Sequence, residues 1–337
     1  MKQNPYRFDP IKEEKLLGGR DDELKKAKNY LDSHYNLFVC GPRGSGKSSF
    51  LNVLKIISNN KNVLIVSIDL KATGTEDNIE FYKKIFDYIM VSGVDKNMFG
   101  GRSAEFYKVF RDFIDNLNPN VELNFYIAKI YLSRINGNCP QVSLPELKND
   151  FKILIEEAKQ KNINSIILVF DDCEKLAKNE QLINTLNSIF DSEMGYRCIF
   201  SGNELLVQSF NESGTVIPIR LRDFTTEKEI KNFLLHPLAD EERNLIDKKA
   251  FKMILNFSQG SASARILTLF GHHMYKNYQE KKTSTISVSY NVVCDVYEQL
   301  EGLVIDSTKK SEVRGLIDGY LKIYKDLYEG GYDDRHQ

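Results

Sequence analysis

The sequence lacks the features that would place it in a membrane or among secreted, disulfide-bonded proteins. No apolar stretch reaches the ~20 residues that a membrane-spanning helix needs, and the opening MKQNPYRFDP lacks the apolar run of a signal peptide. The five cysteines are an odd number, and no two of them stand at the spacing of a metal site. We therefore expect reduced thiols, no membrane partner and a cytoplasmic location.

An excess of charge of one sign is also missing. Lys and Arg total 46 and Asp and Glu total 47, which gives a formal net charge of -1. A protein that coats nucleic acid through bulk charge would be strongly basic. The charge therefore does not indicate a nucleic-acid partner, although a local basic patch stays open. With 42% hydrophobic residues in 337, the chain has enough apolar material for two domains.

The first seventy residues alternate between apolar strands and helices. Residues 35–40 (YNLFVC) form a short apolar run that stops at Gly41, and residues 62–69 (NVLIVSID) form a second, as in buried parallel strands. Residues 48–57 between them have the apolar spacing of a buried helix, and residues 21–33 that of a more polar helix. Strand, loop, helix and strand together predict a βαβ unit.

Three further apolar runs predict the remaining strands, over residues 165–171, 197–201 and 216–221, the last weakened by Pro218. Apolar strands that alternate with helices favour an α/β fold, in which helices cover both faces of a parallel sheet. An insertion over residues 71–160 separates the second strand from the third. Within it we expect helices over residues 79–90, 104–117 and 145–160 and a short hairpin or strand over residues 121–132.

Only helical patterns follow Phe224, and they predict a small all-helical domain over residues 225–300. The core domain would then comprise residues 1–224, and residues 301–337 would form a tail with one more helix over 311–328. The helices expected in the helical domain cover residues 227–235, 247–257, 264–278 and 288–300.

Residues 41–48 (GPRGSGKS) match the phosphate-loop pattern G-x-x-x-x-G-K-[ST] in full. In this pattern the glycines let successive N–H groups point at phosphate oxygens, and the following helix directs its positive end at the anion. Lys47 would reach the β and γ phosphates, and the Ser48 hydroxyl would bind Mg²⁺. An accidental glycine turn is the alternative, but the apolar strand before the loop and the helix after it disfavour that interpretation. We expect the nucleotide to contact Gly41, Pro42, Arg43, Gly44, Ser45, Gly46, Lys47, Ser48 and Ser49.

Two carboxylates follow the third strand directly. Four apolar residues precede Asp171 and Asp172, and a carboxylate at the end of a strand beside the phosphate strand is placed to hold Mg²⁺. We assign Asp171 to the metal, and Asp172 to orienting or deprotonating the attacking water. Glu174 would support them. A solvated acidic turn that leads into a helix is the alternative.

At this point the sequence resembles the AAA+ and STAND-type P-loop ATPases, nearest the branch of archaeal and bacterial origin-recognition-like ATPases. The resemblance spans residues 4 to about 300. It implies a three-layer αβα P-loop NTPase core with the sheet order 5-1-4-3-2 and a helical lid formed by residues 225–300. The motifs that carry it are NPYRFDP, GGRDDEL, GPRGSGKS, SIILVFDDCEKL, IFSGN and RLRDFTTEKEI.

The resemblance also implies further site residues. Asn203 is similar to the sensor-1 residue, which joins Lys47 and Asp172 in the catalytic set, although a turn residue is the alternative. Arg265 resembles the sensor-2 arginine that reaches the γ-phosphate, although an arginine on a helix surface is the alternative. Tyr6 and Arg20 would lie near the adenine. The choice of ATP with Mg²⁺ rests on the resemblance, since no guanine-reading N-K-x-D motif is present.

The chain departs from the family pattern in three places. Asp172 stands where the family usually has glutamate, which is one methylene longer, so we expect slow hydrolysis. Residues 204–219 contain no Arg or Lys that could serve as an arginine finger. Residues 301–337 are too few for the winged-helix DNA-binding domain of the origin-recognition branch.

Three functions fit the sequence. The first is an ATP-driven switch that controls assembly with a protein partner or with itself. The aromatic-rich residues 79–132 are a candidate surface for it, although core packing is the favoured alternative for most of them. The second is a DNA-associated assembly factor of initiator or transposition-regulator type. The third is a small-molecule kinase, which would need a second substrate pocket and an acceptor; the sensor-like residues and the helical lid disfavour it.

Overall fold

The fold was analysed in a computed structural model, which describes residues 4–11, 13, 17–70, 78–95, 144–160, 162–176, 179, 182–184, 186, 190, 195–210 and 216–301. The helices expected over residues 104–117 and 311–328 and the hairpin or strand expected over residues 121–132 lie outside this part of the chain.

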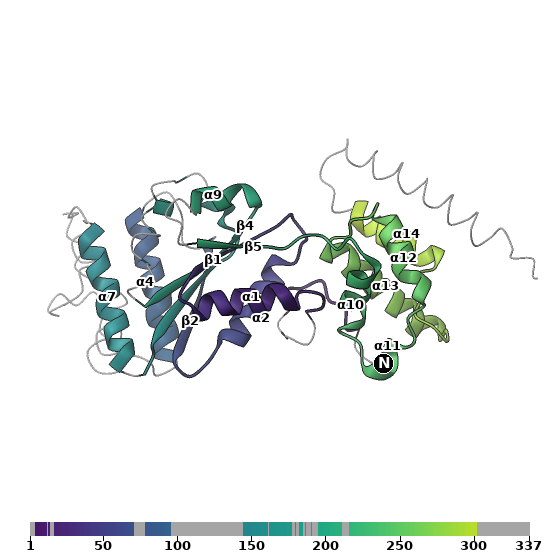
Figure 1. Cartoon of the computed structure of the whole chain (residues 1–337), viewed down its shortest axis with the longest axis horizontal. Helices are drawn as coiled ribbons and strands as arrows, with labels where there is room; N and C mark the ends of the chain where they lie inside the picture. The colour runs from purple at the N-terminus through teal and green to yellow at the C-terminus, as the bar shows by residue number, and fades with distance from the viewer. Residues whose placement is uncertain are drawn as a thin grey trace, which may run out of the picture. The chain divides into compact units, whose positions relative to one another are not determined.

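The described strands form one parallel sheet of five, in the order β2-β3-β4-β1-β5 (Figure 1). This is the predicted order, 5-1-4-3-2, read from the opposite edge, and the α/β P-loop NTPase fold is confirmed. All four pairings are parallel. The strands are β1 (Asn36–Cys40), β2 (Val63–Ile68), β3 (Ser165–Phe170), β4 (Tyr196–Gly202) and β5 (Val216–Arg220).

Burial along the strands explains why the sequence read as continuous apolar runs. Every residue of β1, β3 and β4 is buried, as expected for strands with neighbours on both sides and helices on both faces. The outer strands β2 and β5 each include an exposed polar residue, Ser67 and Arg220 respectively. Pro218 is tolerated because β5 pairs with β1 alone among the described strands.

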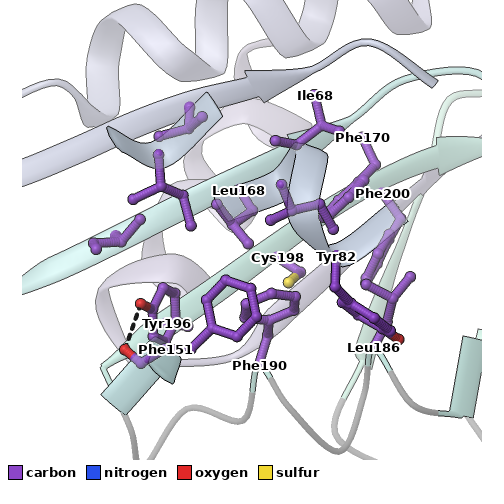
Figure 2. Packing of buried hydrophobic residues seen from close by; sticks show 14 of the residues in the cluster. Ile68, Tyr82, Phe151, Leu168, Phe170, Leu186, Phe190, Tyr196, Cys198 and Phe200 are labelled. Atoms are coloured by element: carbon purple, nitrogen blue, oxygen red, sulfur yellow. Dashed lines mark hydrogen bonds between the residues drawn. The ribbon is translucent and has the colours of Figure 1, made fainter. Parts of the chain in front are cut away.

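Helices on both sides of the sheet supply its core. Figure 1 shows α4 (Asn78–Asp95) and α7 (Leu144–Gln160) on one side and α1 (Asp21–Asp32) and α2 (Lys47–Ser58) on the other. The core beneath α4 and α7 is rich in aromatic rings (Figure 2). Within it, Phe151 and Phe190 meet edge to face at 4.7 Å, and the Tyr196 hydroxyl donates to the carbonyl of Phe151 at 2.7 Å. Phe81, Tyr82 and Phe86 of α4 are buried in the same core, so these aromatic residues serve packing and not a partner surface.

The chain divides into two compact units. The sheet unit contains the described residues within 22–42 and 50–221, and the helical unit those within 4–21, 43–49 and 222–301. The N-terminal segment, residues 4–21, and most of the phosphate loop therefore belong with the helices. None of the helices in the described part of the chain has the length and apolar character needed to cross a bilayer.

The helical unit has its own hydrophobic core. Its helices begin at residues suited to capping: Thr226 forms a capping box with Glu229, and Asp247 and Ser263 accept hydrogen bonds from their first turns. The short α9 (Val207–Phe210) and α11 (Asp240–Arg243) escaped prediction because a single turn carries no periodicity. The other helices are α10 (Glu227–Leu235), α12 (Lys248–Phe257), α13 (Ala264–Lys281) and α14 (Tyr290–Glu301).

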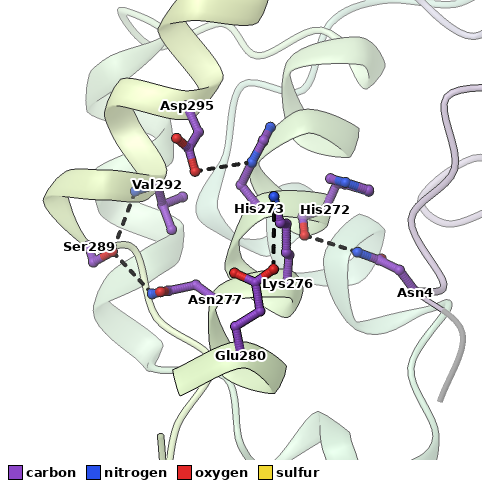
Figure 3. Close-up of polar contacts among 9 residues, drawn as sticks. All are labelled: Asn4, His272, His273, Lys276, Asn277, Glu280, Ser289, Val292 and Asp295. Atoms are coloured by element: carbon purple, nitrogen blue, oxygen red, sulfur yellow. Dashed lines mark hydrogen bonds and ion pairs between the residues drawn. The ribbon is translucent and has the colours of Figure 1, made fainter. Parts of the chain in front are cut away.

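Polar contacts join α13 to its neighbours (Figure 3). The His273 ring lies 3.4 Å from the Asp295 carboxylate of α14, and the Asn277 amide donates to the Ser289 hydroxyl at 3.2 Å. On the N-terminal segment, the Asn4 amide donates to the carbonyl of His272 at 3.0 Å. These contacts fix α13, the helix whose amino end meets the phosphate loop.

Candidate nucleotide-binding site

The phosphate loop connects β1 to α2 and has the backbone that the sequence pattern requires. Gly44 and Gly46 have φ angles of 87° and 92°, in the left-handed region that glycine adopts without a Cβ clash. Helix α2 begins at Lys47, so its first N–H groups face the loop. The Ser45 hydroxyl is buried and has no hydrogen-bond partner among the described residues. A turn with left-handed glycines, a helix start and an orphaned hydroxyl fits a bound phosphate chain.

The amino end of α13 packs against this loop. The Arg265 N–H donates to the carbonyl of Gly44 at 3.1 Å. A Cβ added to Gly44 would lie 3.2 Å from the Cβ of Arg265, and one added to Gly46 would lie 3.5 Å from the Cβ of Ala264. The structure therefore brings the backbone of Arg265 to the loop. Its side chain is exposed, and contact with a γ-phosphate stays a prediction.

Arg20 holds the loop from a second direction. Its guanidinium is buried, donates to the carbonyls of Ser45 at 3.4 Å and Arg222 at 2.5 Å, and lies 4.2 Å above the Phe224 ring. A guanidinium is suited to this because it presents several donors in one plane. The structure assigns Arg20 to backbone support of the loop, a role that the sequence did not suggest. The contact of Arg20 with adenine stays a prediction.

Tyr6 lies in the core of the helical unit. Its ring is 4% exposed, its hydroxyl donates to the carbonyl of Leu234, and Gly271 leaves it the space that a Cβ would occupy. Burial raises the pKa of the Tyr6 hydroxyl, so it acts as a neutral donor. Tyr6 thus anchors the N-terminal segment to the helices, and its contact with adenine stays a prediction. Further along, the N–H of Ile11 donates to the Ser49 hydroxyl of α2 at 3.0 Å.

The acidic strand end forms a compact polar turn in the sheet unit. Asp171 follows β3 and is half-buried, while Asp172 is exposed and has a left-handed backbone, with φ 60° and ψ 48°. The Ser201 hydroxyl of β4 donates to Asp171 Oδ1, and the Asp172 N–H donates to the same oxygen at 3.0 Å. Ser201 is not among the predicted site residues, although it lies in the IFSGN motif.

Strand order places the candidate groups of the sheet unit at one edge. Because β3, β4 and β1 are adjacent and parallel, Asp171, Asn203 and Gly41 all follow strands at the same carboxyl end. The Asn203 side-chain oxygen is buried and lacks a hydrogen-bond partner in the described part of the chain. The role of Asn203 as a sensor residue stays a prediction.

Two further side chains, Arg220 of β5 and Cys173 after β3, are already engaged. Arg220 pairs with Glu204 at 2.6 Å, which raises the pKa of the Arg220 guanidinium through the hydrogen bond to that carboxylate. The thiol of Cys173 is buried, and desolvation raises its pKa well above the ordinary value, so it is not a nucleophile.

A magnesium ion would take few ligands from this protein. Among the described residues, no group of three or more His, Cys, Asp or Glu side chains could hold a metal ion. Mg²⁺ bound with a nucleotide needs only one or two carboxylates beside phosphates and water. In the sheet unit Asp171 offers one such carboxylate, and binding of Mg²⁺ by Asp171 and Ser48 stays a prediction.

The sequence matches no family model and no curated protein. Among solved structures, a chain of the Drosophila ORC bound to DNA is similar at 11% identity and a TM-score of 0.50, over 88% of this chain and 64% of that one. The Aeropyrum pernix ORC1 protein in complex with DNA aligns at 12% identity and a TM-score of 0.43, over 85% of this chain and 66% of that one. The chain thus spans less than two thirds of either length.

At such identities the first of these likenesses concerns the fold alone. Together with the strand order, it supports the α/β P-loop NTPase fold with a helical C-terminal region.

Proposed function

We propose that this protein binds ATP with Mg²⁺, hydrolyses it slowly and uses the nucleotide state to control assembly with a protein partner or with itself. The observation that carries the proposal is the loop of residues 41–48. It has left-handed glycines, it is followed by a helix start, and it contacts α13 directly.

Each group has a task in this proposal. The loop amides and Lys47 hold the phosphates, while Ser48 and Asp171 hold the metal, which when bound would neutralise charge on the phosphates. Asp172 orients or deprotonates the attacking water, and Asn203 donates to it or to the γ-phosphate. Turnover is slow because Asp172 has a short side chain on a left-handed backbone, which limits its reach.

The packing of α13 on the loop supports a switch. Phosphate binding draws the loop N–H groups toward the ligand, and the Gly44 carbonyl that accepts from Arg265 belongs to the same backbone. The position of α13 and the shape of the loop are therefore coupled. A nucleotide that favours one loop shape favours one packing of α13, which is the bistable element that a switch needs.

A DNA-associated assembly factor is the second candidate. The similar Drosophila chain belongs to an ORC that is bound to DNA, and this is the observation that favours it. The formal net charge of -1 weighs against bulk attraction to DNA, so the contact would need a local basic patch.

One set of samples tests both candidates. Molecular mass is measured by light scattering with ATP, with ADP and without nucleotide, while phosphate release is followed in the same samples. The switch predicts a mass or partner affinity that differs between ATP and ADP, with phosphate released in the absence of any acceptor. Equal behaviour in all three states, with the chain alone and with candidate partners, would reject it. Salt-dependent DNA binding that requires ATP would favour the second candidate.

A further inference from the structure

Ser201 contacts both residues of the acidic strand end. Its side chain is fully buried on β4, and its hydroxyl donates to Asp171 Oδ1 while lying 3.3 Å from the backbone nitrogen of Asp172. One hydroxyl therefore bridges the side chain of the first aspartate and the backbone of the second.

The strand register explains this meeting. In the parallel pairing of β3 with β4, Val169 lies beside Ile199 and Phe170 beside Phe200. One step further along both strands, Asp171 comes beside Ser201. A small side chain with a hydroxyl fits there, because it reaches the carboxylate across the strand spacing without leaving the buried edge.

The two carboxylate oxygens of Asp171 differ in their hydrogen bonds. Oδ1 accepts from Ser201 and from the Asp172 N–H, whereas Oδ2 accepts no hydrogen bond from the described residues. The carboxylate is thus held in one orientation, with one oxygen committed to the protein. The same contacts support the left-handed backbone of Asp172, which aspartate adopts only at some cost.

We propose that Ser201 is a positioning residue for the metal and the water: it fixes which oxygen of Asp171 is offered to Mg²⁺ and the direction in which Asp172 projects. The inference rests on the proposed function, because it assigns Ser201 a part in that same site. Ser201 itself does not touch nucleotide or water. Groups that orient a metal ligand typically change metal affinity by about 10–100-fold when they are removed.

Ser165 provides a matched control on the neighbouring strand. It is a serine, buried to the same degree, at the amino end of β3, and its hydroxyl has no hydrogen-bond partner in the described part of the chain. Ser165→Ala and Ser201→Ala each remove one buried hydroxyl oxygen from the sheet. Only Ser201→Ala removes a bond to Asp171.

The test titrates Mg²⁺ into the full chain with a fluorescent ATP analogue. For Ser201→Ala we expect unchanged affinity for the analogue without Mg²⁺. The Mg²⁺ concentration that gives half-maximal enhancement of analogue binding should rise about tenfold. Phosphate release by Ser201→Ala should also fall. Ser165→Ala should match the wild type in its affinity without Mg²⁺, in the half-maximal Mg²⁺ concentration and in phosphate release. Asp171→Ala marks the full loss of the metal ligand. Ser201→Cys, which keeps a side chain of similar shape with a weaker donor, should lie between Ser201→Ala and the wild type.

The outcomes separate the inference from the proposed function. If the wild type binds the analogue with a Mg²⁺ dependence and Ser201→Ala and Ser201→Cys behave like Ser165→Ala, the positioning role is wrong and the proposed function stands. Loss of affinity without Mg²⁺ in both Ser201 variants would also overturn it, because that marks a general structural defect. A wild type that does not bind the analogue at all rejects the proposed function, and the inference with it.

Discussion

The backbone N–H of Arg265 donates to the carbonyl oxygen of Gly44 at 3.1 Å, which joins the first turn of α13 to the phosphate loop. Ser263 caps this helix, since its hydroxyl accepts from the N–H of Ile266 at 3.3 Å. The loop and the helix are therefore connected through backbone atoms. Substitution of a side chain at Arg265 leaves that connection in place, whereas a change in the loop backbone does not.

A side chain at Gly44 should disturb this contact. Gly44→Ala places a Cβ 3.2 Å from that of Arg265 on a backbone with φ of 87°. Gly260→Ala is the control, because Gly260 has φ of 81° but nothing within 4 Å of the added atom. We expect Gly260→Ala to cost about 1 kcal/mol in free energy of unfolding through backbone strain alone, and Gly44→Ala to cost more. Chemical denaturation without nucleotide measures both, and equal losses would contradict the contact.

Lys47 should determine nucleotide affinity. Lys47→Ala removes two charge-assisted contacts to phosphate of about 1.5 kcal/mol each, which corresponds to a loss of roughly 100-fold in ATP affinity. Lys55→Ala is the control, since Lys55 lies on the same helix, in its last turn, and donates to Ser67 at 3.2 Å. Isothermal titration with ATP compares the two variants. Unchanged affinity in the Lys47 variant would refute the phosphate-loop assignment.

The turn and the helix start at residues 41–48 could be predicted from the sequence because the pattern is local. Each of its residues acts through backbone angles or a side chain within an eight-residue segment, and the apolar strand before it is equally visible. The strands were predictable for the same reason, since burial on both faces leaves continuous apolar runs such as SIILVF. The sheet order came from the family resemblance, not from the runs themselves.

The supporting contacts could not be predicted, because their partners are distant in the chain. Arg20 donates to the carbonyl of Arg222, and Ser201 donates to Asp171 only because β3 and β4 pair in one register. No local sequence pattern at Arg20 or Ser201 indicates which residue it will contact. The same holds for the packing of Tyr6 against Gly271, since the two residues are far apart in the chain, and the contact with adenine that the resemblance implies stays a prediction.

Asp172 should control turnover and not binding. Its carboxylate is exposed, and its N–H, which donates to Asp171 Oδ1 at 3.0 Å, does not depend on the side chain. Asp172→Asn keeps the shape and the tolerance of a left-handed backbone while removing the base. We expect ATP affinity to stay unchanged and phosphate release to fall by about 100-fold or more. Asp240→Asn, the same change at an exposed aspartate of α11, is the control. Wild-type turnover in the Asp172 variant would remove it from the mechanism.

His273 should make the stability of the helical unit depend on pH. Burial is the main cause that lowers the pKa of its imidazole below the ordinary value, with His272 and Lys276 acting in the same direction and Gln299 and Asp295 opposing them. The folded protein therefore binds a proton at His273 less readily than the unfolded chain does. The contribution of neutral His273 to the free energy of unfolding is therefore fully present above the unfolded pKa of about 6.5. As the pH drops below that value, the free energy of unfolding falls by at most about 1.4 kcal/mol per pH unit.

Replacing His273 should flatten that pH dependence. Chemical denaturation between pH 7.5 and 5.5, values chosen to span about 6.5, is compared for the wild type, for His273→Gln and for the exposed control His34→Asn. We expect His273→Gln to lose part of the stability at the upper pH, because it changes a ring packed within the α13–α14 contact. Its free energy of unfolding should nevertheless fall less on acidification than that of the wild type or of His34→Asn. A slope equal to that of the wild type would mean that another group titrates in this range, because a side chain without an ionisable group cannot take up the proton.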